Sequence, residues 1–162
     1  MTRIVPKALA YWIALSAITL VDFVSKRLAE SRLSLHTPHD VAGEWVRMTL
    51  TYNTGAAMNV SLGDFSRPGL SLVAVVMLVI LHRMYRALPS RDRFQALALG
   101  LVSGGALGNL LDRVRSARGV VDFIDVGTSG WRFWTFNVAD FGVTVGAGLL
   151  AVIFMRRPTD QA

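Results

Sequence analysis

Four long runs of apolar residues divide the chain, and their lengths set the first expectation about its fold. The runs extend over approximately residues 8–25, 69–86, 94–112 and 138–156. A helix rises about 1.5 Å per residue, so each run approaches the length that crosses a hydrocarbon core about 30 Å thick. The pattern therefore predicts four transmembrane helices.

The two outer loops, at about 26–68 and 113–137, carry a different pattern. In WVRMTLTY, residues 45–52, apolar and polar side chains alternate with the period of two that is typical of a strand with one covered face. GVVDFIDV (119–126) and GWRFW (130–134) in the second loop are also β-prone and are bounded by glycines. Four helices place both loops on the same side of the membrane, where we expect a small antiparallel β cradle.

The expected fold class is thus a membrane all-α protein whose single domain spans residues 1–162, with an extracytoplasmic β cradle. Composition agrees, because 52% of the residues are hydrophobic, 17% are charged and the mean hydropathy is +0.44. The net charge of +6 does not indicate nucleic-acid binding, since the basic residues flank the apolar runs. Their density in the short segments beside the termini favours cytoplasmic termini, although the total Lys and Arg counts do not decide it.

Several classes of chemistry are disfavoured by composition. The chain has no cysteine, which excludes disulfides, thiolate metal sites and a cysteine nucleophile. The histidines, His36, His39 and His82, match no metal-binding spacing. We interpret His36 and His39 as plain loop residues, and we expect neither a metal nor a cofactor.

Polar residues from separate segments are expected to meet at one membrane boundary, because successive helices alternate in direction. The set comprises Asp22, Asn53, Asn109, Asp112, Asp122, Asn137 and Asp140. Singly, each has a structural explanation: Asp140 could cap a helix, Asp22 and Lys26 have the spacing of a supporting pair, and Asp112 could pair with Arg113. Together they indicate a functional site, because ionisable groups inside membranes usually mark one.

The third apolar run contains glycines at a spacing of four, namely Gly100, Gly104 and Gly108. Such a face lets another helix approach closely, and this is our interpretation of Gly100. Gly104, Gly105 and Gly108 could also make room for a substrate helix or a lipid chain, and spacing does not separate these possibilities.

Two aspartates without metal ligands suggest an acid–base pair. Close like charges raise the pKa of one carboxyl group, so the pair keeps one proton near neutral pH. One carboxylate can then take a proton from an attacking water while the other assists the carbonyl oxygen. A Ser25–Lys26 nucleophile is disfavoured, because neighbours on a helix point about 100° apart.

Five motifs in order resemble those of the bacterial lipoprotein signal peptidases, also called signal peptidase II. They are VDFVSK at 21–26, YNTGAA at 52–57, GGALGNLLDR at 104–113, VVDF at 120–123 and FNVAD at 136–140. The resemblance extends over nearly the whole chain, and the ordered set is far more specific than any one motif.

The resemblance implies an inner-membrane aspartic endopeptidase that removes signal peptides from diacylglyceryl-modified prolipoproteins, cutting before the lipidated cysteine. The implied catalytic pair is Asp122 and Asp140, near the extracytoplasmic face. The residues implied in substrate binding or in support of this pair are Asp22, Lys26, Asn53, Gly108, Asn109, Arg113 and Asn137. The implied partners are the lipidated substrate and membrane lipids, without nucleic acid or cofactor, and we expect a monomer.

Three positions depart from the usual motifs. Phe23 replaces a glutamine, Met58 replaces a phenylalanine and Phe141 follows Asp140 where serine is common. These departures affect details of substrate fit, and Phe141 could alter the polarity beside Asp140.

The alternative hypothesis is a small transporter or proton-relay subunit in which buried aspartates carry protons or cations. Such a protein is expected to place its acids at the membrane midplane and often to contain internal repeats. Here the acids gather at one boundary and no repeat is evident, which favours a site over a pathway.

Overall fold

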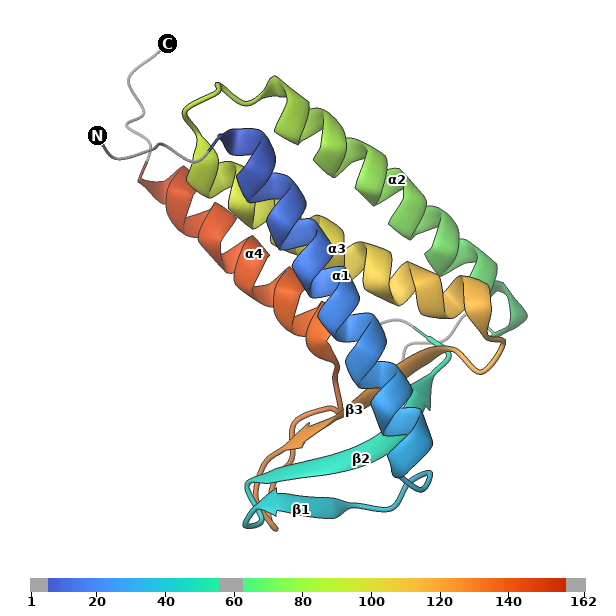
Figure 1. Ribbon diagram of the computed structural model, residues 1–162. Helices are drawn as coiled ribbons and strands as arrows, with labels where there is room; N and C mark the ends of the chain where they lie inside the picture. The colour runs from blue at the N-terminus through green and yellow to red at the C-terminus, as the bar shows by residue number, and fades with distance from the viewer. Residues whose placement is uncertain (1–5, 56–62, 157–162) are drawn as a thin grey trace.

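The computed structural model describes residues 6–55 and 63–156, and four long helices dominate it. Each is long and apolar enough to cross a membrane, which confirms the predicted fold class. The helices are α1 (Lys7–Arg32), α2 (Ser66–Ala87), α3 (Arg93–Arg115) and α4 (Val138–Met155). The first turn of α1 and the last turn of α4 lie at the same end of the bundle (Figure 1).

α1 continues seven residues beyond the end expected at residue 25. Hydropathy follows only the apolar run, whereas the helix continues through RLAESR, in which most residues are good helix formers. Ala29 in this extension is buried in a cluster with Leu50, Val121 and Phe123. The extension is therefore held by packing against residues of the two outer loops.

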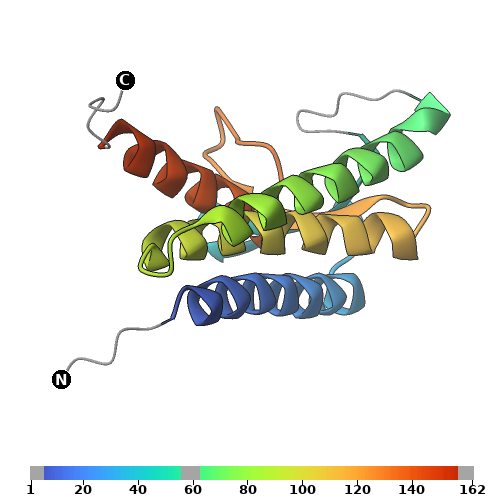
Figure 2. The same cartoon turned by 90° about the horizontal axis from the view of Figure 1, so that it is seen from above.

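α3 is the central helix and packs against α1, α2 and α4 (Figure 2). Its glycines explain the close approach of the neighbouring backbones. A Cβ atom on Gly100 would lie 2.5 Å from the carbonyl oxygen of Tyr11, and one on Gly104 would lie 2.7 Å from that of Leu15. Gly105 makes the same close approach to α4. Gly104 and Gly105 thus serve helix packing, as expected for Gly100.

A three-stranded antiparallel sheet lies at the other end of the bundle (Figure 1). Its strands are β1 (His39–Ala42), β2 (Val46–Asn53) and β3 (Val120–Val126), in the order β1-β2-β3. β2 comes from the first loop and β3 from the second, with Thr51 opposite Asp122. The sheet therefore joins the two loops over the helix ends, as the alternating pattern predicts.

The segment 130–134, which is β-prone in sequence, forms no strand. Within it, only Arg132 forms an isolated bridge, with Gly127, and Phe136 just beyond it forms another with Ile124. Arg132 instead donates to the Asp125 carboxylate at 2.6 Å and to the Glu44 carbonyl. These polar contacts fix the segment as an irregular loop beside β3.

Gly100→Ala is expected to destabilise the bundle by about 1–3 kcal/mol, because the new methyl group forces α1 away from α3. Thermal unfolding in detergent measures the effect. Gly148→Ala is the matched control: a Cβ there meets nothing within 4 Å, and alanine is the better helix former. Equal stability of the two variants would contradict the packing role of Gly100.

Candidate active site

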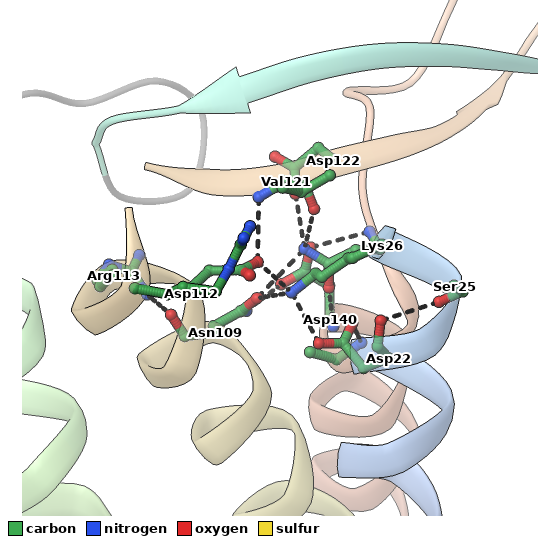
Figure 3. A network of polar contacts seen from close by, with 12 residues as sticks. Asp22, Ser25, Lys26, Asn109, Asp112, Arg113, Val121, Asp122 and Asp140 are labelled. Atoms are coloured by element: carbon green, nitrogen blue, oxygen red, sulfur yellow. Dashed lines mark hydrogen bonds and ion pairs between the residues drawn. The ribbon is translucent and has the colours of Figure 1, made fainter. Parts of the chain in front are cut away.

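Lys26 is the most connected group at the boundary between the helices and the sheet (Figure 3). Its side chain is fully buried, and its Nζ lies 2.7 Å from Asp22 Oδ2 and 3.0 Å from Asp112 Oδ2. The same ammonium donates to Asn109 Oδ1 at 2.9 Å. All three of its N–H groups have acceptors, which is the condition for burying a charge at acceptable cost.

Asp22 connects three helices. One carboxylate oxygen pairs with Lys26, and the other accepts a hydrogen bond from the backbone N–H of Ala139 at 2.8 Å. A Cβ on Gly108 would lie 2.5 Å from Asp22 Oδ2, so the glycine makes room for this carboxylate. The Asp22–Lys26 pair expected from the spacing of four is present, but it is buried rather than an exposed helix pair.

Asp112 extends the network to the sheet. It pairs with Lys26 and with Arg27 Nη2 at 3.0 Å, instead of with its neighbour Arg113. Its Oδ2 also accepts from the backbone N–H of Val121 in β3 at 3.2 Å. The Asp112–Arg113 pair considered from sequence is therefore wrong, because adjacent residues of a helix point in different directions.

Two asparagines connect this charged network to the remaining aspartates. Asn109 Nδ2 donates to Asp140 Oδ1 at 2.8 Å. Asn137, which is fully buried, directs its Nδ2 at Asp122 Oδ1 at 2.6 Å and at Asn109 Oδ1 at 3.2 Å. The amide groups thus hold the side chains of Asp122, from β3, and Asp140, from α4, near one another.

Asp140 also caps α4, as its position near the helix start suggests. Its backbone N–H donates to Asn137 Oδ1 at 3.0 Å, and its Oδ2 accepts from the Asn137 N–H at 3.2 Å. This reciprocal capping box fixes the helix start and the carboxylate together. The structural and the functional explanations of Asp140 are compatible.

A cavity of about 700 Å³ opens beside these two carboxylates. Asp122 and Asp140 both line it, together with Asn53, Asn109 and Arg113. The sheet supplies Thr51 and Tyr52, and the loop after β3 supplies Phe133, Trp134, Thr135 and Phe136. A cavity of this size with an apolar wall and a few convergent polar groups has the character of a ligand site.

Arg113 and Asn53 are placed at the cavity wall by backbone contacts. The Arg113 guanidinium donates to the carbonyl oxygens of Asn109 at 3.2 Å and Gly55 at 3.4 Å. Asn53 Oδ1 accepts from the Gly55 N–H at 3.0 Å. Both side chains thus meet at the turn after β2, close to Asp122.

Burial, and after it the negative charge of Asp140, raise the pKa of Asp122 to about 7. Hydrogen bonds from Asn137 and Asn53 and the charge of Lys26 oppose the shift without cancelling it. Near neutral pH the carboxyl group of Asp122 therefore exchanges a proton readily. The arrangement supplies one acid and one base at the same cavity.

The Ser25–Lys26 scheme is not supported by the geometry. The Ser25 hydroxyl donates to the Asp22 carbonyl at 3.0 Å, and Lys26 Nζ is occupied by Asp22, Asp112 and Asn109. Neither side chain lines the large cavity.

Two features of the site were missed from sequence. Glu30, in the extension of α1, pairs with Arg27, Arg115 and Arg118 and accepts from the Tyr52 hydroxyl. The Arg27–Glu30 spacing of three was the available signal, but the helix was expected to end before it.

His36 is the second missed feature. It lies in the loop between α1 and β1, as interpreted, but it also lines the cavity, which no motif or spacing marked. His39, interpreted in the same way, instead begins strand β1, so that interpretation is wrong.

Two of the three residues that depart from the family motifs, Phe23 and Phe141, do not line the cavity. Phe23 is 41% exposed and packs beside the Arg27 guanidinium, and Phe141 is 59% exposed. Neither lines the cavity, so the polarity beside Asp140 is set by Asn109 and Asn137. Met58 lies outside the described residues.

Comparisons with known proteins agree with the motifs. The chain matches the family model described as signal peptidase (SPase) II over residues 14–156. It is 44% identical over 156 residues to the lipoprotein signal peptidase of Pseudomonas syringae pv. tomato, covering 93% of this chain and 89% of that protein. The protein of the same name from Coxiella burnetii is 38% identical, with 93% of each chain covered.

Two solved structures described as bacterial membrane enzymes share the fold. One has a TM-score of 0.81 and 25% identity, covering 93% of this chain and 92% of that one. The other has a TM-score of 0.80 and 26% identity, with 90% and 92% covered.

Lys26→Met is expected to lower the free energy of unfolding by about 3–5 kcal/mol, because Asp22 and Asp112 lose the buried cation that compensates them. Thermal unfolding in detergent checks this. Arg32→Met, at the exposed end of the same helix, is the control and is expected to change stability by less than about 0.5 kcal/mol. A Lys26 variant as stable as the control would refute the role of the ammonium.

The raised pKa of Asp122 also predicts a pH-dependent stability. The folded protein binds this proton more tightly than the unfolded chain does, so the contribution is present below about pH 4 and is lost as the pH rises through about 7. The melting temperature of the wild type should therefore fall relative to that of Asp122→Asn between about pH 5 and pH 8. A constant difference would show that the carboxyl group is not perturbed.

Proposed function

The chain belongs to the signal peptidase II family, and we propose that Asp122 and Asp140 are the catalytic pair with which it removes signal peptides from prolipoproteins. Membership of this family makes the protein a peptidase of the bacterial inner membrane that crosses it several times. The aspartic mechanism is our proposal. The observation that carries it is the position of both carboxylates on one cavity wall, where burial raises the pKa of Asp122 to about 7.

The proposed reaction requires one proton shared by the two carboxyl groups. Asp140 accepts hydrogen bonds from Asn109 Nδ2 and the Asn137 N–H, while burial favours the proton on Asp122. Asp140 takes a proton from water as the water oxygen attacks the scissile carbonyl carbon, and Asp122 gives its proton to the carbonyl oxygen.

Collapse of the resulting tetrahedral diol completes the hydrolysis. The carbon–nitrogen bond breaks, the nitrogen takes the proton held by Asp140, and one hydroxyl proton of the diol returns to Asp122. The products are a signal peptide with a new carboxyl group and a lipoprotein with a free amine. The pair ends the cycle in its starting protonation state.

Residues around the pair fit supporting roles in this scheme. Asn109 and Asn137 orient the carboxylates, and Asp22 and Lys26 hold α1, α3 and α4 in register beneath them. Gly108 leaves the space that Asp22 needs. Asn53 and Arg113 line the cavity and are placed to contact the substrate peptide.

We propose that the substrate is the diacylglyceryl-modified form, cut before its lipidated cysteine. Val143 and Thr144 continue the cavity wall along α4 from Asp140 toward the middle of the bundle. Acyl chains and an apolar signal helix can therefore reach the pair from within the bilayer. Membrane lipids surround the remaining exposed apolar faces of the helices.

The proposed orientation places the site at the extracytoplasmic face and both termini in the cytoplasm. Basic residues cluster at the end of the bundle opposite the sheet, in short segments: Lys7, Arg83, Arg86, Arg91, Arg93 and Arg156. This density agrees with the positive-inside rule. We further propose that the chain acts as a monomer, because one copy supplies the whole set of proposed site residues.

The transporter alternative is not favoured. The acidic residues lie at the helix ends beside the sheet. The carboxylates of Asp22 and Asp140 accept hydrogen bonds from backbone N–H groups around the start of α4. A relay would place them near the midplane. The family assignment points the same way.

Asp122→Asn and Asp140→Asn are each expected to lower turnover of a diacylglyceryl-modified prolipoprotein at least about 100-fold while leaving the protein folded. Removing either carboxyl group removes the acid or the base. Cleavage by purified protein in detergent is the measurement, with Asp40→Asn in exposed β1 as a control that stays active. Near wild-type turnover in either site variant would exclude the pair.

The unlipidated precursor, assayed beside the lipidated one, tests the substrate class. Cutting of the lipidated form alone is expected. Equal cutting of both forms would retain the peptidase but contradict the requirement for the lipid.

A further inference from the structure

His36 lies in the connection between α1 and β1, and its side chain lines the same cavity as Asp122 and Asp140. The proposed hydrolysis makes no use of it. An imidazole that lines the cavity but takes no part in the reaction is a candidate for binding the substrate.

The backbone at His36 is held in an unusual conformation. Its φ of 57° is in the left-handed region, and among residues 6–55 and 63–156 no other residue except glycine has a positive φ. Histidine tolerates this region better than most residues, yet it still costs about 1 kcal/mol. The conformation is fixed by the bridge between Leu35 and Leu50 and by the hydrogen bond from His36 N–H to the Leu50 carbonyl at 2.9 Å.

The direction of the substrate follows from the architecture. An apolar signal helix needs the bilayer, so it approaches along the helices, past Val143 and Thr144. The polypeptide after the cut bond must leave the membrane on the extracytoplasmic side. In the orientation proposed above, this is the end of the bundle that carries the sheet (Figure 1). His36 and Tyr52 therefore line the part of the cavity that the residues after the lipidated cysteine would enter.

Resting on the function proposed above, we propose that His36 is a specificity-determining residue that donates a hydrogen bond to an acceptor side chain in the first three residues after the lipidated cysteine. A ring nitrogen of histidine can donate whether the imidazole is neutral or protonated. Acidic side chains are the strongest acceptors.

The charged residues near Tyr52 also favour an acidic side chain in the substrate. Tyr52 donates to Glu30, which pairs with Arg27, Arg115 and Arg118. Arg27 also pairs with Asp112, so three guanidinium groups meet two carboxylates there. The Arg118 guanidinium lies 4.4 Å from the centre of the Tyr52 ring. A lysine in the substrate at this point would meet like charge, whereas an aspartate would not.

The test uses matched diacylglyceryl-modified substrates with Asp or Lys at each of the first three positions after the cysteine. The two substrates compete in one reaction, and the ratio of their kcat/KM values is measured. Both meet the same catalytic pair, so the pH dependence of catalysis cancels in the ratio. Wild type is expected to prefer Asp by about two- to five-fold at one position, the size of an exposed charge contact.

Two variants suit the left-handed backbone and should remain folded. His36→Gly removes the ring and is expected to bring the ratio close to one, and His36→Asp is expected to reverse the preference. His39→Asp, at an exposed position in β1 outside the cavity, controls for a change in net charge and should keep the wild-type ratio.

The outcomes distinguish the role of His36 from the proposed peptidase function on which it rests. If wild type cuts both substrates without a preference, or if His36→Gly keeps the preference unchanged, His36 does not determine specificity. Failure of wild type to cut any lipidated substrate would overturn the proposed function as well.

Discussion

A single buried ammonium group, that of Lys26, organises the part of the molecule where the helices meet the sheet. Its three hydrogen atoms reach Asp22, Asp112 and Asn109. Those partners in turn bind the start of α4, the backbone of β3 and Asp140. A charge removed from water is tolerable only when its partners are complete, so the positions of four elements are fixed together.

The two proposed catalytic carboxylates gain their properties from this rigid support. Asp140 is anchored by the capping box of α4, and Asp122 by the amide of Asn137. The same enclosure that raises the pKa of Asp122 makes its ionised form costly to the fold. The fold therefore loses some stability at Asp122, where the proposed reaction needs an exchangeable proton. Such a loss is common at active sites.

Hydropathy and side-chain period predicted the four helices and the strand β2, because membrane thickness and the pleat of a sheet act on each segment separately. The convergence of the acids followed from helix direction alone. Contacts that depend on the extension of α1, such as Arg27 with Asp112, were not predictable from the apolar pattern. The position of His36 depends on a bridge to β2, for which the local sequence gives no signal.

The central claim is that Asp122 and Asp140 share one proton that is released near neutral pH. It is tested most directly by the pH dependence of kcat/KM for a diacylglyceryl-modified prolipoprotein, measured with wild-type protein in detergent. The account predicts a bell-shaped profile whose alkaline limb has an apparent pKa near 7. A rate that stays constant up to about pH 9 would contradict it, because the shared proton would be lost well before that pH.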